Sequence, residues 1–178
     1  MRHALPAAAL AALTLASAAT AQTTPAAPAA PPARANCDPA EHHQLDFWVG
    51  EWRVFQKADG VEVGSSTIAA VADGCGVSEH YSSPGAPGGA YEGYSYSAFD
   101  RKDGKWHQFY VDVNGNATWF TGQLEGAEMA LYAPGRQGAQ QRMSYTLNPD
   151  GSVEQVGVVS TDGGKTWQPG YDYVYRRR

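Results

Sequence analysis

The sequence lacks the short motifs that mark the common catalytic sites. It contains no G-x-S-x-G nucleophile elbow, no H-E-x-x-H zinc motif, no P-loop and no G-x-G-x-x-G dinucleotide fingerprint. We therefore assign no catalytic residue, no cofactor and no metal ligand from the sequence. This favours a protein that is not an enzyme.

Basic residues are scarce. The 178 residues include 13 basic and 18 acidic ones, and two of the basic residues, Arg2 and Arg34, precede Cys37. The segment 37–178 therefore has 11 basic against 18 acidic residues, a formal charge of −7. A domain this acidic offers no electrostatic footprint for nucleic acid or for anionic lipid. We expect no nucleic-acid partner.

Long apolar runs are also missing. The longest, 4–18, is interrupted by Pro6, Thr14 and Ser17, and it is too short to span a bilayer of about 30 Å comfortably. It follows Arg2 and ends in the A-x-A triplet at 19–21, which is the pattern of a cleaved secretory signal. The sequence therefore predicts a signal peptide at 1–21 and a periplasmic or secreted protein without stable membrane insertion. A retained membrane anchor is the alternative.

The next fifteen residues, 22–36, include six alanines and four prolines. Such a segment has almost nothing bulky and apolar to bury, so it cannot offset its conformational entropy. We predict a disordered linker there. The remaining 142 residues, 37–178, are enough for a single folded domain.

Cysteine is limited to Cys37 and Cys75, and both follow the predicted signal. In an oxidising compartment an even pair is most simply a disulfide. Two distant cysteines supply too few ligands for a zinc site, and a redox pair would more naturally be C-x-x-C. We predict a structural Cys37–Cys75 disulfide.

What the domain does contain is short runs rich in Val, Thr, Tyr, Phe and Trp, separated by Gly, Asn and Asp turns. Asp-Gly or Asn-Gly pairs at 59–60, 103–104, 114–115 and 150–151 are typical of tight hairpins. A meander of such strands has two exposed edge strands, and closing into a barrel removes them. We predict an all-β, antiparallel up-and-down barrel of about 8–10 strands, with a short helix within 39–49. The expected strands are 51–56, 61–71, 75–82, 90–99, 105–113, 118–124, 128–132, 141–148, 153–160 and 171–177.

The segment 160–167 fits the Asp-box pattern S-x-D-x-G-x-T-W of β-propeller glycosidases. In that context it is a hairpin tip and has no catalytic role. A propeller needs several blades of about 40 residues, for which the domain is too short. We interpret this single copy as a rigid turn.

The segment 45–52 begins to resemble a known architecture. A short helix leading into G-x-W on the first strand is how lipocalins and other calycin barrels start, with the Trp closing one end. The chain is also similar to exported bacterial proteins of unknown function in the DUF1579 family. The shared motifs are D-F-W-x-G-E-W at 46–52, Gly74-Cys75, Glu79, Tyr81, W-H-Q-x-x-V-D-x-x-G at 106–115, the 160–167 turn and the terminal Tyr-Arg-Arg. The resemblance implies a lipocalin-like fold and no established activity. Tyr81 and Tyr110 stand where the family pattern has Trp.

Strand alternation predicts which side chains face the lumen. If Trp52 points inward, as the resemblance implies, so do Val54 and Gln56. On the fifth strand, apolar pattern alone favours His107, Phe109 and Val111 as the inner set, whereas the resemblance favours Trp106, Gln108, Tyr110 and Asp112. We adopt the second set. The third strand would then add Cys75, Val77, Glu79 and Tyr81, and the eighth strand Arg142. The candidate ligand-binding residues are Glu79, Tyr81, Gln108, Tyr110 and Arg142.

Three hypotheses for function follow. The first is a barrel that binds a small molecule, because apolar walls with a few placed polar groups are typical of such sites. The second is a haem-binding or enzymatic barrel that uses His80 or His107 as iron ligand or general base. The third is an envelope structural or interaction module with a filled core, in which Glu79 and Arg142 only pair with each other. The oligomeric state is left open.

Overall fold

The computed structural model describes residues 37–178, and the predicted signal peptide and linker lie outside the described residues. Two short 3-10 turns, η1 and η2, precede ten strands, and a third, η3, lies between β7 and β8. The elements are η1 (Ala40–His43), η2 (Asp46–Trp48), β1 (Gly50–Gln56), β2 (Glu62–Val71), β3 (Gly76–Ser83), β4 (Tyr91–Asp100), β5 (Lys105–Asp112), β6 (Ala117–Glu125), β7 (Glu128–Pro134), η3 (Arg136–Gly138), β8 (Gln140–Leu147), β9 (Val153–Ser160) and β10 (Gln168–Arg177).

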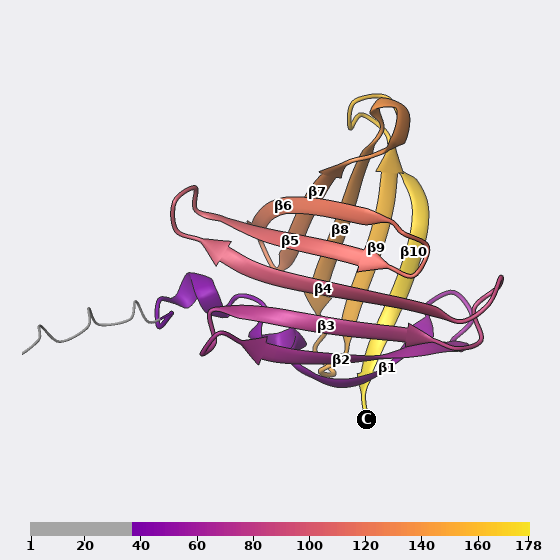
Figure 1. Ribbon diagram of the computed structural model, residues 1–178, viewed down its shortest axis with the longest axis horizontal. Coiled ribbons are helices and arrows are strands. Elements are labelled where there is room, and N and C mark those ends of the chain that lie inside the picture. Colours follow the sequence, from indigo (N-terminus) through magenta and orange to yellow (C-terminus); the bar gives the residue numbers. More distant parts are fainter. Residues whose placement is uncertain (1–36) are drawn as a thin grey trace, which may run out of the picture. The chain divides into compact units, whose positions relative to one another are not determined.

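The strands form one closed, antiparallel, up-and-down barrel. Each strand pairs with its neighbours in the chain, and β10 returns to pair with β1, with Trp52 opposite Arg177. In Figure 1, β3 to β6 cross in front of β8 to β10, so that the sheet wraps around an interior. The prediction of an antiparallel barrel of about 8–10 strands is confirmed.

The observed strands follow the predicted ones closely, and β9 has the predicted limits. The glycines of the four predicted Asp-Gly and Asn-Gly turns, Gly60, Gly104, Gly115 and Gly151, all have positive φ. The short helical segment predicted within 39–49 is present as two 3-10 helices of four and three residues, neither of which has a side-chain N-cap hydrogen bond. The described part of the chain contains no helix with the length and apolar composition that a membrane crossing requires.

The predicted disulfide is present. Cys37 is bonded to Cys75, with the two Cα atoms 5.1 Å apart and a sequence separation of 38. It ties the residues before η1 to the turn that precedes β3. The N-terminal turns are thereby held at the end of the barrel where β1 and β3 begin.

This end of the barrel is closed by tryptophans. Trp52 is fully buried, and its Nε1 donates to the carbonyl oxygen of Trp48 at 2.8 Å. The Arg177 guanidinium lies 4.2 Å from the centre of a Trp52 ring and donates to the Val49 carbonyl at 2.9 Å. Trp106 Nε1 donates to Gln44 Oε1 at 2.9 Å. The Trp of G-x-W thus closes the barrel, as its position in the motif predicts, and we call this the closed end.

The turn between β9 and β10 has the rigid structure predicted for it. The Asp162 carboxylate accepts hydrogen bonds from the backbone N–H groups of Lys165 and Thr166 at 3.0 and 2.9 Å, and from the hydroxyls of Thr166 and Ser160 at 2.7 and 2.8 Å. These bonds, chiefly those from Thr166, lower the pKa of Asp162 to about 2. The carboxylate therefore stays charged and holds the tip together.

Candidate functional site

The barrel encloses a cavity of about 1850 Å³. Its lining includes the ends of four hairpins, at 61–64, 83–87, 115–118 and 134–139, so the cavity reaches the end of the barrel opposite the tryptophans. We call this the open end. Pockets that hold drug-sized molecules measure about 300–1,000 Å³, so the space is ample for a small ligand. The filled interior that the third hypothesis required is not observed.

Four of the five predicted site residues line this cavity: Glu79, Tyr81, Gln108 and Tyr110. The register adopted for β5 is confirmed, because Gln108 is 1 % exposed whereas Phe109 is 39 % exposed on the outer face. The two inward positions on β3 follow from the same alternation, with Val77 buried below Glu79. Strand pairing places Gln108 opposite Ser97 and Glu79 opposite Ser95. Both serines belong to β4, so Gln108 on β5 and Glu79 on β3 project into the lumen from the two strands that flank β4.

Glu79 lies at the base of the cavity and is 7 % exposed. Its carboxyl group contacts the hydroxyls of Ser66 at 3.0 Å, Ser95 at 3.2 Å and Tyr175 at 3.4 Å. None of the ion pairs in residues 37–178 involves Glu79. Burial raises the pKa of Glu79 to about 7, against the opposing effect of the three hydroxyls. A large share of the molecules therefore carries a neutral carboxylic acid there at neutral pH.

The hydrogen bonds continue from Tyr175 across the barrel. Tyr175 donates to Gln155 Oε1 at 2.7 Å, and Gln155 Nε2 lies 3.2 Å from the Tyr145 hydroxyl. Gln108 Nε2 donates to the same hydroxyl at 3.2 Å and to Ser97 Oγ at 3.0 Å. These residues come from β10, β9, β8, β5 and β4. Together with Glu79 they form what we call the polar belt, which separates the open cavity from the tryptophans of the closed end.

Tyrosine side chains form the walls between the polar belt and the open end. Tyr171 and Tyr173 stack with ring centres 5.1 Å apart, and Tyr81 lies 6.5 Å from Tyr173 and 6.0 Å from Tyr91. Tyr91 also shares a hydrogen bond with the Tyr110 hydroxyl. Burial raises the pKa of Tyr81 to about 12 and that of the other four above the ordinary value. All five remain neutral at physiological pH.

Three of these tyrosines lie against inward-facing glycines of a neighbouring strand. A Cβ atom at Gly93 would stand 2.5 Å from the Tyr110 hydroxyl, and one at Gly157 would stand 2.2 Å from Tyr171 Cε1. A Cβ at Gly64 would stand 3.0 Å from the Tyr81 hydroxyl. A glycine inside a strand is typical of such a close approach. The rings therefore lie along the wall and leave the middle of the lumen open.

Sequence reasoning missed Tyr91, Tyr171 and Tyr173 as wall residues. A signal was present for two of them, because Tyr171, Tyr173 and Tyr175 alternate with Asp172 and Val174 on β10. All three of these tyrosines line the cavity. The inward glycines Gly93 and Gly157 were a second signal, since a strand interior rarely carries glycine without a packing reason.

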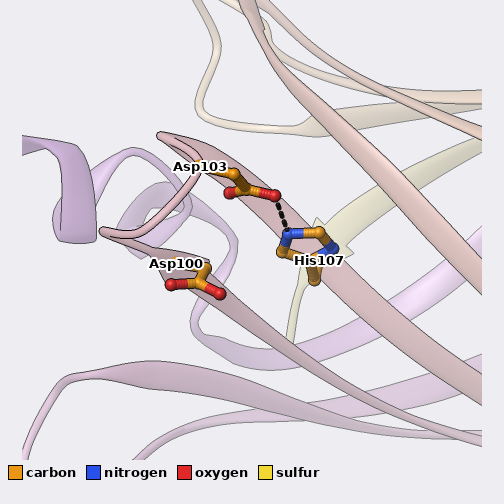
Figure 2. A group of neighbouring side chains, drawn as sticks. All are labelled: Asp100, Asp103 and His107. Atoms are coloured by element: carbon orange, nitrogen blue, oxygen red, sulfur yellow. Dashed lines mark hydrogen bonds and ion pairs between the residues drawn. The ribbon is translucent and has the colours of Figure 1, made fainter.

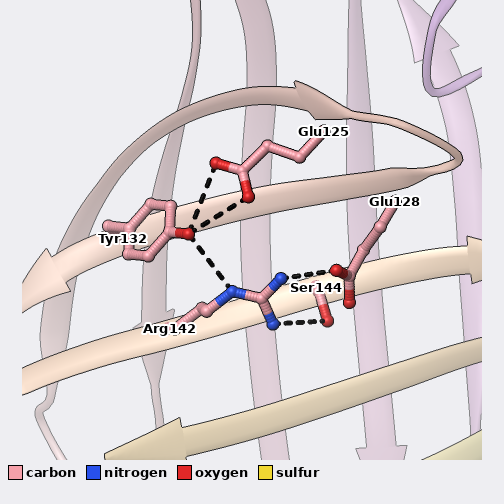
Figure 3. Close-up of polar contacts among 5 residues, drawn as sticks. All are labelled: Glu125, Glu128, Tyr132, Arg142 and Ser144. Atoms are coloured by element: carbon pink, nitrogen blue, oxygen red, sulfur yellow. Dashed lines mark hydrogen bonds and ion pairs between the residues drawn. The ribbon is translucent and has the colours of Figure 1, made fainter. Parts of the chain in front are cut away.

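The placement of Arg142 in the cavity is wrong. On β8 the inward side chains are Met143 and Tyr145, so Arg142 points to the outer face. There it pairs with Glu128, and it also lies 3.3 Å from the Tyr132 hydroxyl (Figure 3). Because side chains alternate with a period of two, a shift of one position moves a residue through the sheet. Arg142 is therefore not the partner of Glu79.

The two candidate histidines also lie outside the lumen. His80 stacks on Tyr94 with ring centres 4.4 Å apart, and neither residue lines the cavity. His107 Nε2 is 2.9 Å from Asp103 Oδ2 (Figure 2). Its Nδ1 is 3.1 Å from Thr121 Oγ1. The haem or general-base hypothesis placed one of these histidines at the site. The structure does not place either of them there.

Asp100, Asp103 and His107 have ligand atoms within 4.8 Å of one another (Figure 2). Both aspartates are exposed, at the turn between β4 and β5. Asp100 accepts a hydrogen bond from the Lys102 N–H at 2.8 Å, and Asp103 accepts one from Lys105 at 3.0 Å. These are the bonds that Asp makes in an ordinary turn. They account for the grouping without a metal ion.

Comparison with known proteins adds no family. No family model matches the chain, and a search of curated proteins finds no match. The similarity to the DUF1579 proteins therefore stands as a resemblance of motifs. The closed antiparallel barrel supports the lipocalin-like fold that this resemblance implies, and it supports no more than the fold.

Proposed function

We propose that the protein binds a small molecule in the lumen of its barrel, outside the cytoplasm. The observation that carries the proposal is the cavity of about 1850 Å³, which is open at one end and closed at the other by tryptophans. Binding sites for small molecules are mostly apolar concavities with a few placed polar groups. Here the walls are aromatic, and the polar belt supplies a carboxyl group, two amides and several hydroxyls.

The location rests on the disulfide. Bonds such as Cys37–Cys75 persist in the periplasm and in the extracellular space, and they are rare in the reducing cytosol. The signal sequence expected at 1–21 leads to the same compartment. A binding protein needs no catalytic group. The polar side chains at the base of the cavity form hydrogen bonds with one another, which agrees with a role in binding.

A pair of neighbouring glutamines provides the test. Gln141 lines the cavity near its open end, whereas Gln140 is exposed on the outer face. A tryptophan at position 141 should occupy part of the lumen, and a tryptophan at position 140 should leave it free. We expect the neutral fluorescent probe N-phenyl-1-naphthylamine to bind the parent protein and Gln140→Trp equally. For Gln141→Trp we expect binding at least about tenfold weaker, roughly the cost of one overpacked side chain.

Fluorescence titration measures the affinities, and circular dichroism establishes that all three proteins are folded. Equal affinity of the probe for the two variants would place its binding outside the lumen. Absence of binding to the parent protein would count against a ligand-binding cavity.

A further inference from the structure

Among the residues that the structure describes, three acidic and two basic ones line the lumen: Glu62, Glu79, Asp112, Arg136 and Arg178. Glu62 pairs with Arg53. Glu79 lies at the base of the lumen, and Asp112 lies near the open end, where it accepts a hydrogen bond from Tyr91 at 3.1 Å. The basic residues among those that line the cavity are Arg136, in the β7–β8 hairpin, and Arg178, at the chain end. In the part of the chain that the structure describes, neither forms a hydrogen bond or an ion pair with Glu79.

The groups that face Glu79 from the surrounding strands are all uncharged at neutral pH. Ser66 on β2 and Ser95 on β4 contact the carboxyl directly. The titratable groups that interact with it among residues 37–178 are tyrosines. They are Tyr81 on β3, Tyr110 on β5, Tyr145 on β8, and Tyr171 and Tyr175 on β10. A buried carboxylate without a cation is costly, and this is the reason that Glu79 retains its proton.

The geometry of Tyr175 agrees with a protonated Glu79. A phenol has one proton to donate, and the 2.7 Å contact with Gln155 Oε1 uses it. Gln155 turns its NH₂ group toward Tyr145, so its oxygen can only accept from Tyr175. The 3.4 Å contact from Tyr175 to Glu79 Oε1 is then the weaker bond of this hydroxyl, so Tyr175 does little to stabilise a carboxylate. The environment of Glu79 therefore suits a neutral acid.

The walls beside this acid are suited to a cation. Tyr81, Tyr110, Tyr171 and Tyr173 lie between Glu79 and the open end, on the same strands as the polar belt or on neighbouring ones. Aromatic faces attract organic cations, and cages of aromatic side chains are a common means of binding quaternary ammonium groups. A ligand that enters from the open end passes these rings and meets the carboxyl at the base.

We propose that the lumen selects an organic cation with an apolar body, of the ammonium class, and that Glu79 is its counter-ion. This inference rests on the proposed function, because it names the ligand class of the same cavity. When the cation arrives, Glu79 gives its proton to solvent and becomes a carboxylate. Binding of the cation therefore leaves the net charge of the cavity unchanged.

Isothermal titration calorimetry with benzyltrimethylammonium tests this on the folded protein. The probe has no ionisable proton, so any proton released on binding comes from the protein. Titrations in two buffers of different ionisation enthalpy count the released protons. We expect nearly one proton at about pH 6, where Glu79 is mostly protonated, and few at about pH 8.5. The apparent affinity should fall by about tenfold per pH unit below the pKa of the carboxyl.

Two variants distinguish Glu79 from other acids. Glu79→Gln keeps the shape of the neutral acid, and we expect it to bind the cation at least about tenfold more weakly and to release no proton. Glu128→Gln removes a carboxylate from the outer face and should bind as the parent protein does. The neutral naphthylamine probe should bind Glu128→Gln as it binds the parent, because Glu128 lies outside the cavity.

The outcomes separate this inference from the proposed function. Binding of the neutral probe without binding of the cation would overturn the ligand class and leave the binding cavity. Cation binding without proton release, or unchanged binding to Glu79→Gln, would overturn the role of Glu79. A protein that binds neither probe would contradict both.

Discussion

Replacing Glu79 by glutamine is expected to stabilise the protein at alkaline pH and to have little effect at acidic pH. The folded-state pKa of about 7 lies above the ordinary value of 4.5 for a glutamate. Between these values the folded state binds more protons than the unfolded chain, so the free energy of unfolding falls as pH rises. Over about pH 4 to 8 this contribution amounts to about 3 kcal/mol, and it is absent in Glu79→Gln.

Urea unfolding of both proteins across this pH range provides the measurement. The free energy of unfolding of the variant minus that of the parent should increase by about 3 kcal/mol from about pH 4 to about pH 8. Glu128→Gln is the control with the opposite sign. Burial opposes ionisation of Glu128, but hydrogen bonds from Arg142 and Ser144 outweigh it and lower its pKa. Removing that carboxylate should therefore destabilise the protein at neutral pH, by less than about 1 kcal/mol. A difference for Glu79→Gln that is constant with pH would contradict a neutral Glu79.

Replacing both cysteines by serine is expected to lower the free energy of unfolding by about 4 kcal/mol. The bond closes a loop with a sequence separation of 38. On the chain-entropy model, its loss raises the conformational entropy of the unfolded chain, and this lowers the free energy of unfolding by that amount. For a domain of this size the loss corresponds to a fall in melting temperature of about 10 °C or more.

Thermal unfolding with and without reductant checks this expectation. The parent protein under reducing conditions should melt close to the Cys37→Ser, Cys75→Ser double variant, and reductant should leave the variant unchanged. A double variant that melts within a degree or two of the oxidised parent would show that the disulfide contributes little. The N-terminal turns would then be held to the barrel by packing and by hydrogen bonds such as that from Trp106 to Gln44.

The sequence predicts the scaffold because its signals are local. The limits of β9, the four Asp-Gly and Asn-Gly turns and the turn around Asp162 each depend on a few neighbouring residues. The closing role of Trp52 follows from its motif, and the disulfide follows from a pair of cysteines that has no other partners.

The inner face of β5 was harder to predict, because the outer face also carries large apolar side chains. Phe109 is 39 % exposed and lies 4.9 Å from the ring of Trp119, which is 59 % exposed. These outward aromatics give the wrong set of positions an apolar pattern. The correct inner set, which contains the polar residues Gln108 and Asp112, was indicated by the resemblance and not by hydrophobicity.

Arg142 was misplaced by one position. The inner residues of β8 are Met143 and Tyr145, which alternate with Arg142 along the strand. The actual environment of Glu79 is built from residues far away in the sequence, such as Tyr175, which is 96 positions distant. Such partners depend on the register of the whole closed barrel, which no local pattern reveals.

Native mass spectrometry of the protein recovered from its own cells tests the central claim most directly. The account predicts a parent barrel that carries one co-purifying small molecule, retained in Gln140→Trp and lost or much reduced in Gln141→Trp. The released molecule should be an amine or a quaternary ammonium compound with an apolar body. Parent protein that appears only at the mass of the polypeptide, and that takes up neither the neutral nor the cationic probe, would contradict a ligand-binding lumen.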